Sequence, residues 1–178
     1  MRINIRAKDF EVTDSIKSYI EEKSSKLNKY ISKEDMELNV LLSGNKNTNY
    51  SVEFTLNTGN LYIRAEEKNA DLYAGIDLSI DKIEEQEKYI ESIHMMNEGL
   101  FNRTGNRKSY FCTTFGCQMN EHDSEMLINM LEAMGYVQAL SEDQADLVIY
   151  NTCAVRENAE LKVYGNLGHL KSIKRKRP

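Results

Sequence analysis

Two cysteines stand where a thiol can bind a metal. Cys117 lies in TTFGCQMNEHDSEML, directly after an apolar run and directly before a helical pattern, and Cys153 closes a second apolar run, ADLVIYNTC. Loops that follow neighbouring parallel strands meet at one edge of a sheet, so the two thiols are expected near each other. Their spacing of 36 residues alone favours two unrelated loop thiols. The metal hypothesis therefore depends on the sequence that surrounds them.

The third cysteine and the N-terminus indicate where the chain resides. Cys112 lies inside the apolar run YFCTTF and is expected to be a small core residue, with a substitute metal ligand as the less favoured alternative. The N-terminal stretch MRINIRAKDFEVTD has no apolar segment of the secretory kind. An odd number of cysteines without a secretion signal predicts a cytoplasmic protein rather than a disulfide framework.

The composition predicts a soluble globular protein of 178 residues in one domain or two small ones. Hydrophobic residues make up 40% and charged residues 29%, and no apolar stretch reaches the length that crosses a bilayer, so no membrane partner is expected. The net charge of −5 gives no general attraction for nucleic acid. Any RNA binding must come from local basic patches. The composition leaves the oligomeric state open.

Residues 1–86 have the pattern of an α+β domain in the order β-α-β-β-β-α. Alternating apolar residues predict strands in RINIR, MELNVLL, YSVEFTL and LYIRAEE, with NTGN as a hairpin turn. Helical spacing predicts one helix near residues 13–31 and a second one capped by Asn69, with Leu72, Ile76, Ile80 and Ile83 on its apolar face. We expect an antiparallel-rich sheet with both helices on one face.

The pattern changes after residue 86. Residues 87–108 continue the helical spacing and then break at GLFNRTGNRK, which predicts a helical or flexible linker. From residue 109 to 178 the order is strand, helix, strand, helix, and the dense apolar strands favour a parallel α/β unit.

The first part resembles the N-terminal domain of the ribosome hibernation-promoting factors. The resemblance rests on NIRAKDFEVTDSIKSYIEEKSSKLNKY and LYIRAEEKNADLYAGIDLSIDKIE. It implies the fold expected above and binding to the small ribosomal subunit, where such domains block translation in idle ribosomes. Long members of that family add a C-terminal dimerisation domain, which has no counterpart here.

The second part resembles the N-terminal domain of the tRNA methylthiotransferases that modify isopentenyl-adenosine beside the anticodon. TTFGCQMNEHDSEML and ADLVIYNTCAVRENAELKVYGNLGHLK carry this resemblance. It implies an auxiliary [4Fe–4S] cluster held by three cysteines, of which Cys117 and Cys153 are the first two. A third ligand, the radical S-adenosylmethionine motif and the S-adenosylmethionine site have no counterpart before Pro178. The second part therefore reads as an incomplete domain with no expected activity of its own.

Basic residues of the first part are the candidates for contact with rRNA phosphates. Their alternative is an ordinary solvated face, because residues 1–86 hold 12 Lys and Arg against 16 Asp and Glu. Lys26, Lys29 and Lys33 fall on one flank of the first helix, and Lys23 lies at the edge of its apolar stripe. The candidates are Arg6, Lys8, Lys23, Lys26, Lys29, Lys33, Arg64, Lys68 and Lys82.

Two functional hypotheses follow. The chain is either a ribosome-binding, translation-inhibiting protein fused to part of a tRNA methylthiotransferase, or essentially a methylthiotransferase fragment whose first domain is a passenger. The basic tail KSIKRKRP is either a solvated helix end or a contact for tRNA.

Overall fold

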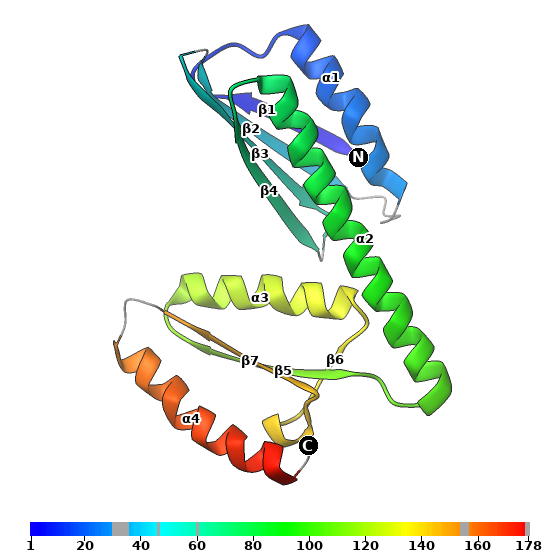
Figure 1. Ribbon diagram of the computed structural model, residues 1–178, viewed down its shortest axis with the longest axis vertical. Helices are drawn as coiled ribbons and strands as arrows, with labels where there is room; N and C mark the ends of the chain where they lie inside the picture. Colours follow the sequence, from blue (N-terminus) through cyan, green and yellow to red (C-terminus); the bar gives the residue numbers. More distant parts are fainter. Residues whose placement is uncertain (30–35, 46, 60, 154–156, 177–178) are drawn as a thin grey trace. The chain divides into compact units, whose positions relative to one another are not determined.

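The computed structural model describes residues 1–29, 36–45, 47–59, 61–153 and 157–176. The chain divides into two compact units, Met1–Ser92 and Ile93–Pro178, which are described separately (Figure 1). Within the described residues, no helix is both long and apolar enough to cross a membrane. The mixed α/β content agrees with the prediction: the first unit has an antiparallel-rich sheet and the second a parallel one.

The sheet of the first unit has four strands in the order β1-β2-β3-β4. The strands are β1 (Arg2–Ala7), β2 (Glu37–Asn45), β3 (Thr48–Asn57) and β4 (Tyr62–Asn69). β2, β3 and β4 form an antiparallel meander, whereas β1 pairs in parallel with β2, with Ile3 opposite Leu38. This parallel edge strand is possible because helix α1 (Asp14–Ser24) and the 3₁₀ turn η1 (Ser25–Lys29) carry the chain back between β1 and β2.

The core of the first unit lies between one face of this sheet and two helices. Side chains alternate along the strands, so Val52, Phe54 and Leu56 of β3 are fully buried. Figure 1 shows α1 and the first half of α2 (Leu72–Thr104) over the same face of the sheet. Their apolar stripes face it, and the buried members are Ile16, Ile20, Leu72, Ile76, Ile80 and Ile83. Neither helix covers the opposite face of the sheet (Figure 1).

The start of α2 differs from the sequence prediction. The Asp71 carboxylate accepts hydrogen bonds from the backbone N–H of Tyr73 (2.8 Å) and Ala74 (3.2 Å), so Asp71 is the N-cap. Asn69, the predicted cap, instead accepts from the N–H of Asp71 (2.9 Å) and shapes the turn before the helix.

The residues predicted as a linker lie mostly in α2. The helix runs as one element through Gly99 and ends at Thr104. Gly105 then has a φ of +73°, and its N–H donates to the Phe101 carbonyl at 2.7 Å, which is the left-handed ending that glycine favours. The division between the two units, at Ser92, therefore falls inside a continuous helix.

The second unit is built on a three-stranded parallel sheet in the order β6-β5-β7. Its elements are β5 (Ser109–Phe115), α3 (Gln118–Ala133), β6 (Val137–Gln138), the 3₁₀ turn η2 (Glu142–Gln144), β7 (Leu147–Thr152) and α4 (Glu157–Lys176). Figure 1 shows α3 and α4 on opposite sides of the sheet. This arrangement matches the parallel α/β unit expected from the sequence.

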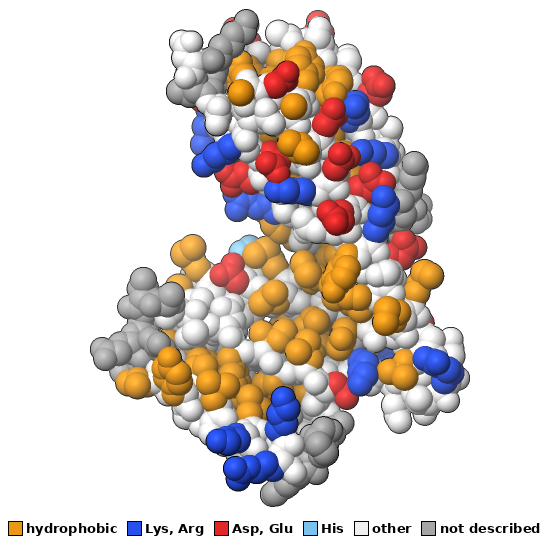
Figure 2. Space-filling model, viewed as in Figure 1, with side chains coloured by type: hydrophobic (Ala, Val, Ile, Leu, Met, Phe, Trp, Pro, Cys, Tyr) orange, Lys and Arg blue, Asp and Glu red, His pale blue; other side chains and the backbone are white. Residues whose placement is uncertain are grey.

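Burial in the second unit is weaker than its apolar strands suggested. Tyr110 is fully buried, and its hydroxyl donates to the Glu132 carboxylate at 2.9 Å. Burial, together with this bond, raises the pKa of Tyr110 to about 12. All six residues of β7 nevertheless stay half-buried, as does most of β5. Figure 2 shows hydrophobic side chains gathered on the visible surface of this unit.

Candidate metal-binding and nucleic-acid-binding sites

The two cysteines lie at the C-terminal ends of neighbouring strands. In the parallel ladder Phe115, the last residue of β5, pairs with Thr152, the last residue of β7. The ladder continues one step further, because the Cys153 N–H donates to the Phe115 carbonyl at 3.0 Å. Cys117 follows Phe115 by two residues and is the N-cap of α3. The structure thus places both thiols at the same edge of the sheet, where the sequence suggested they would lie.

Asn120 fixes the backbone and thiol of Cys117. Its side-chain oxygen accepts the Cys117 N–H at 3.2 Å and lies 3.4 Å from the Cys117 sulfur. Gly116 leaves the space for this side chain, because a Cβ there would approach the Asn120 oxygen to 2.3 Å. With Asn120 in this rotamer, the turn between β5 and α3 therefore has room only for glycine at position 116.

A second asparagine joins the Cys153 strand to the same turn. The Asn151 side-chain N–H₂ donates to the Asn120 backbone carbonyl (2.8 Å) and to the Ser124 hydroxyl (2.9 Å). Asn120 returns a longer bond from its N–H₂ to the Asn151 side-chain oxygen, at 3.4 Å. Ser124 is only 4% exposed, and its hydroxyl lies 2.7 Å from that of Thr114 on β5. One polar network thus links β5, α3 and β7.

The described residues fit only part of an iron–sulfur cluster site. Cys112 lies within β5 opposite Ile149, away from the strand ends. Across the part of the chain that is described, no group of three or more His, Cys, Asp or Glu side chains is arranged to hold a metal ion. Cys117 and Cys153 are half-buried thiols that fit two ligand positions, one fewer than the three cysteines that the resemblance of the second part implies.

Several of the basic candidates in the first unit are already paired with carboxylates. Lys23 lies 3.0 Å from Asp77, and this bond is the main cause of the raised pKa of the Lys23 ammonium. Lys26 bonds Asp81 and lies 3.4 Å from Glu84, and its pKa is raised mainly by the Asp81 bond. Lys23 of α1 and Lys26 of η1 therefore face acidic residues of α2.

Arg64 and Lys82 are paired as well. The Arg64 guanidinium contacts Glu53 at 2.8 Å and Glu66 at 3.5 Å, and Lys82 forms an ion pair with Glu67. Lys33 and the side chain of Lys29 lie outside the described residues. Within the described part of the chain, Arg6, Lys8 and Lys68 have no carboxylate within ion-pair distance.

These three cations belong to the strands at the two edges of the sheet. Arg6 is an exposed residue of β1, and the Lys8 N–H extends that strand by donating to the Leu42 carbonyl at 3.0 Å. Lys68 is on β4, opposite Ser51 of β3. By the alternation of side chains along a strand, Arg6 and Lys68 point to the face that the helices leave open.

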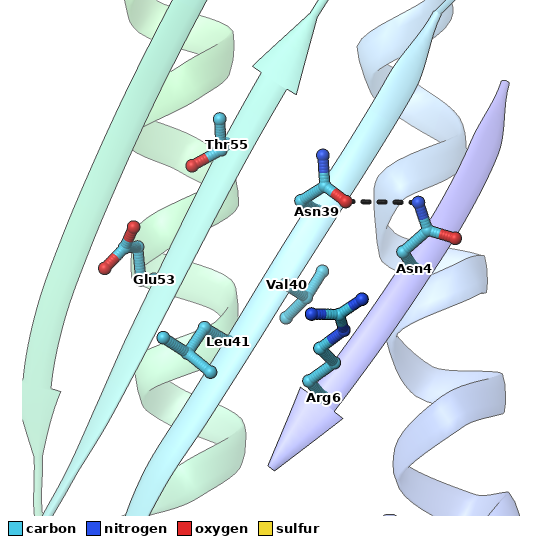
Figure 3. Close-up of a pocket in the computed structure, with 7 residues that line it drawn as sticks. All are labelled: Asn4, Arg6, Asn39, Val40, Leu41, Glu53 and Thr55. Carbon is cyan, nitrogen blue, oxygen red and sulfur yellow. Dashed lines mark hydrogen bonds between the residues drawn. The ribbon is translucent and has the colours of Figure 1, made fainter. Parts of the chain in front are cut away.

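A shallow pocket of about 270 Å³ lies on this open face. Arg6, Asn4, Asn39 and Thr55 provide its polar lining, and Glu53 is its acidic member. Figure 3 shows Arg6 and Asn4 side by side on β1, with the Asn4 amide donating to Asn39 at 3.1 Å. Amide groups and a guanidinium on an exposed sheet can donate hydrogen bonds to phosphate and sugar oxygens.

Asn120 and Asn151 were not predicted from the sequence as site residues. The signal for Asn120 was present, because it stands three residues after Cys117, the spacing at which a side chain bonds back to the N-cap. Asn151 gave no such local signal, since its partners Asn120 and Ser124 lie 31 and 27 residues away.

Comparison with known proteins assigns the two units to different relatives. Residues 109–178 match the family described as "Uncharacterized protein family UPF0004". The chain is 65% identical over 103 residues to the tRNA-2-methylthio-N(6)-dimethylallyladenosine synthase of Clostridioides difficile, and 54% identical over 93 residues to that of Caldicellulosiruptor saccharolyticus. These matches cover 58% and 52% of this chain but only 22% and 20% of the relatives. The chain thus spans about a fifth of the length of these curated relatives.

The first unit has its own relatives. A solved structure, the Protein Y N-terminal domain of Thermus thermophilus, is 32% identical and covers 50% of this chain and 98% of its own, with a TM-score of 0.46. Residues 3–91, half of the chain, match the family described as "Sigma 54 modulation protein / S30EA ribosomal protein". A hibernation-factor-like region is therefore joined to a segment that matches the N-terminal region of tRNA methylthiotransferases. Through residues 3–91 the chain belongs to the Sigma 54 modulation protein / S30EA ribosomal protein family.

Proposed function

We propose that the first unit binds the small ribosomal subunit through rRNA phosphates and inhibits translation. Family membership over residues 3–91 is the observation that carries this proposal. The structure supports it through the open sheet face, where Arg6 and Lys68 stand without carboxylate partners among the described residues. Phosphate contacts dominate nucleic-acid affinity, and cations already held by carboxylates contribute less because each ion pair must first be broken.

Co-sedimentation of the chain with purified small ribosomal subunits over a salt series tests this function. We expect pelleting at low salt that weakens steeply as the salt concentration rises, because phosphate binding releases counterions. A folded sample that fails to pellet at low salt would remove ribosome binding. The first unit would then be a passenger on a methylthiotransferase segment.

For the second unit we propose the cluster-ligating part of a tRNA methylthiotransferase, with Cys117 and Cys153 as two of the ligands. The observation that favours it is the convergence of both thiols at the ends of β5 and β7. A bound iron–sulfur cluster would supply one-electron redox chemistry. We assign no catalytic step and no S-adenosylmethionine site to the described residues, and we assign tRNA contact to the exposed Lys171, Lys174 and Arg175 of α4 only as the alternative to a solvated helix end.

A further inference from the structure

We propose that the side-chain pair Asn120–Asn151 is a positioning element that holds Cys117 and Cys153 at a common point, so that both thiolates can bind one soft metal ion. This inference rests on the proposed ligand role of the two cysteines. It concerns the asparagines, which contact neither a metal nor a reacting group in this arrangement but act through the two cysteine loops.

Asn120 fixes the position of Cys117. The loop after β5 is joined to the first turn of α3 by backbone and side-chain hydrogen bonds, among them the bond from the Glu121 N–H to the Cys117 carbonyl at 3.2 Å. Asn120 supplies one through the Cys117 N–H at 3.2 Å, while packing against Gly116 so closely that a Cβ there would lie 2.3 Å from the amide oxygen. Loss of this side chain would leave the turn without its cap.

Asn151 fixes the strand that ends at Cys153. Asn151 lies two residues before Cys153, and its two donor bonds, of 2.8 and 2.9 Å, fasten the end of β7 to the first turns of α3. The same turn of α3 carries Asn120. Because Ser124 is bonded on to Thr114 of β5, neither cysteine loop can shift without breaking a bond in the shared network.

A polar network at this place lowers the stability of the fold relative to apolar packing, which favours a role in fixing the geometry of the two thiols. Two half-buried amide side chains and a buried hydroxyl occupy a site where apolar residues would pack against the strands. Every polar group in the network has a partner, which is the condition under which a buried network makes a local structure rigid. Groups that orient metal ligands in this way typically change metal affinity by about 10- to 100-fold when removed.

The test is cadmium binding by the full chain, read from the ultraviolet thiolate-to-cadmium charge-transfer band. All variants carry Cys112→Ala, so that the band reports on Cys117 and Cys153. We expect Asn120→Ala, Asn151→Leu and Gly116→Ala each to weaken cadmium binding by about tenfold or more. The matched control is Asn97→Ala, which removes another amide bond of the same unit, to the Met134 carbonyl at 2.8 Å, and should change the affinity less than twofold.

Single-thiol reactivity separates positioning from unfolding. Alkylation of each thiol by a small monofunctional reagent should stay within about twofold of the parent if only the relative placement of the cysteines is lost, whereas unfolding of the unit would accelerate it. Unchanged cadmium affinity in Asn120→Ala and Asn151→Leu would overturn the positioning role. Unchanged affinity in Cys117→Ser and Cys153→Ser would instead overturn the shared ligand role, so the two failures are distinguishable.

Discussion

Replacing Arg6, Lys8 and Lys68 together by alanine is expected to weaken binding to small ribosomal subunits by about a hundredfold. Each cation that contacts a phosphate contributes on the order of 1 kcal/mol, and the three are the candidates without carboxylate partners among the described residues. The slope of binding against salt concentration should fall by about two to three, since each lost contact lowers it by roughly 0.7 to 0.9. All three side chains are exposed, so the fold should persist.

A matched variant removes an equal number of positive charges, three, from the helical side of the first unit. Lys23, Lys26 and Lys82 are held by Asp77, Asp81 and Glu67, so their replacement by alanine should weaken binding much less. Co-sedimentation at several salt concentrations, with circular dichroism to check folding, measures both. If the helical variant loses as much binding as the sheet variant or more, the open face is not the binding surface.

Glu87, a buried carboxyl in the apolar stripe of α2, is expected to make the stability of the fold depend on pH. It is 1% exposed, and neither oxygen has a hydrogen-bond partner within the described part of the chain. Burial, with a smaller contribution from the nearby Glu84 carboxylate, raises the pKa of Glu87 to about 7. In the folded chain the carboxyl therefore stays neutral until about pH 7, whereas the unfolded chain ionises it near its ordinary value of 4.5.

This difference in pKa makes the fold less stable as the pH rises. Well below pH 4.5 both states are protonated and Glu87 adds no pH-dependent penalty, and well above pH 7 the penalty is complete, on the order of 3 kcal/mol. Glu87→Gln keeps the shape and removes the titration, so it should flatten this part of the pH profile and stabilise the chain at pH 8. Urea unfolding followed by circular dichroism at pH 5 and pH 8 compares the two. An identical pH dependence in Glu87→Gln and the parent would show that Glu87 is not the cause.

The helices and strands of the first unit could be predicted from the sequence because the residue patterns that indicate them are local. Val52, Phe54 and Leu56 alternate along β3 and are all fully buried, and Ile76, Ile80 and Ile83 mark the buried side of α2. The same spacing also passes through Glu87 and Ile90, so the burial of that carboxyl could have been suspected from the pattern. The helix beyond Gly99 was harder to predict, because glycine lowers helix propensity without forbidding the conformation.

The candidate phosphate-binding and metal-binding sites could be predicted only in part, because the contacts that define them join residues far apart in the sequence. Lys26 was predicted on a flank of the first helix, but its partner Asp81 lies 55 residues away, and no periodicity reveals that pairing. The convergence of Cys117 and Cys153 followed from strand order alone. The amide network that connects their loops depends on which strand lies beside which helix, and this emerges only from the packed unit.

The pairing of β1 with β2 has a consequence for how the first unit folds. β2, β3 and β4 are consecutive and are closed by short turns, whereas Ile3 must find Leu38, 35 residues along the chain. Closing the longer loop costs more entropy before any contact offsets it, so β1 should be the last strand to join. Because Arg6 belongs to that strand, a nascent or partly folded chain would present the proposed phosphate-binding face in incomplete form. Pulsed hydrogen exchange during refolding should show amide protection in β3 before β1, and simultaneous protection would contradict this order.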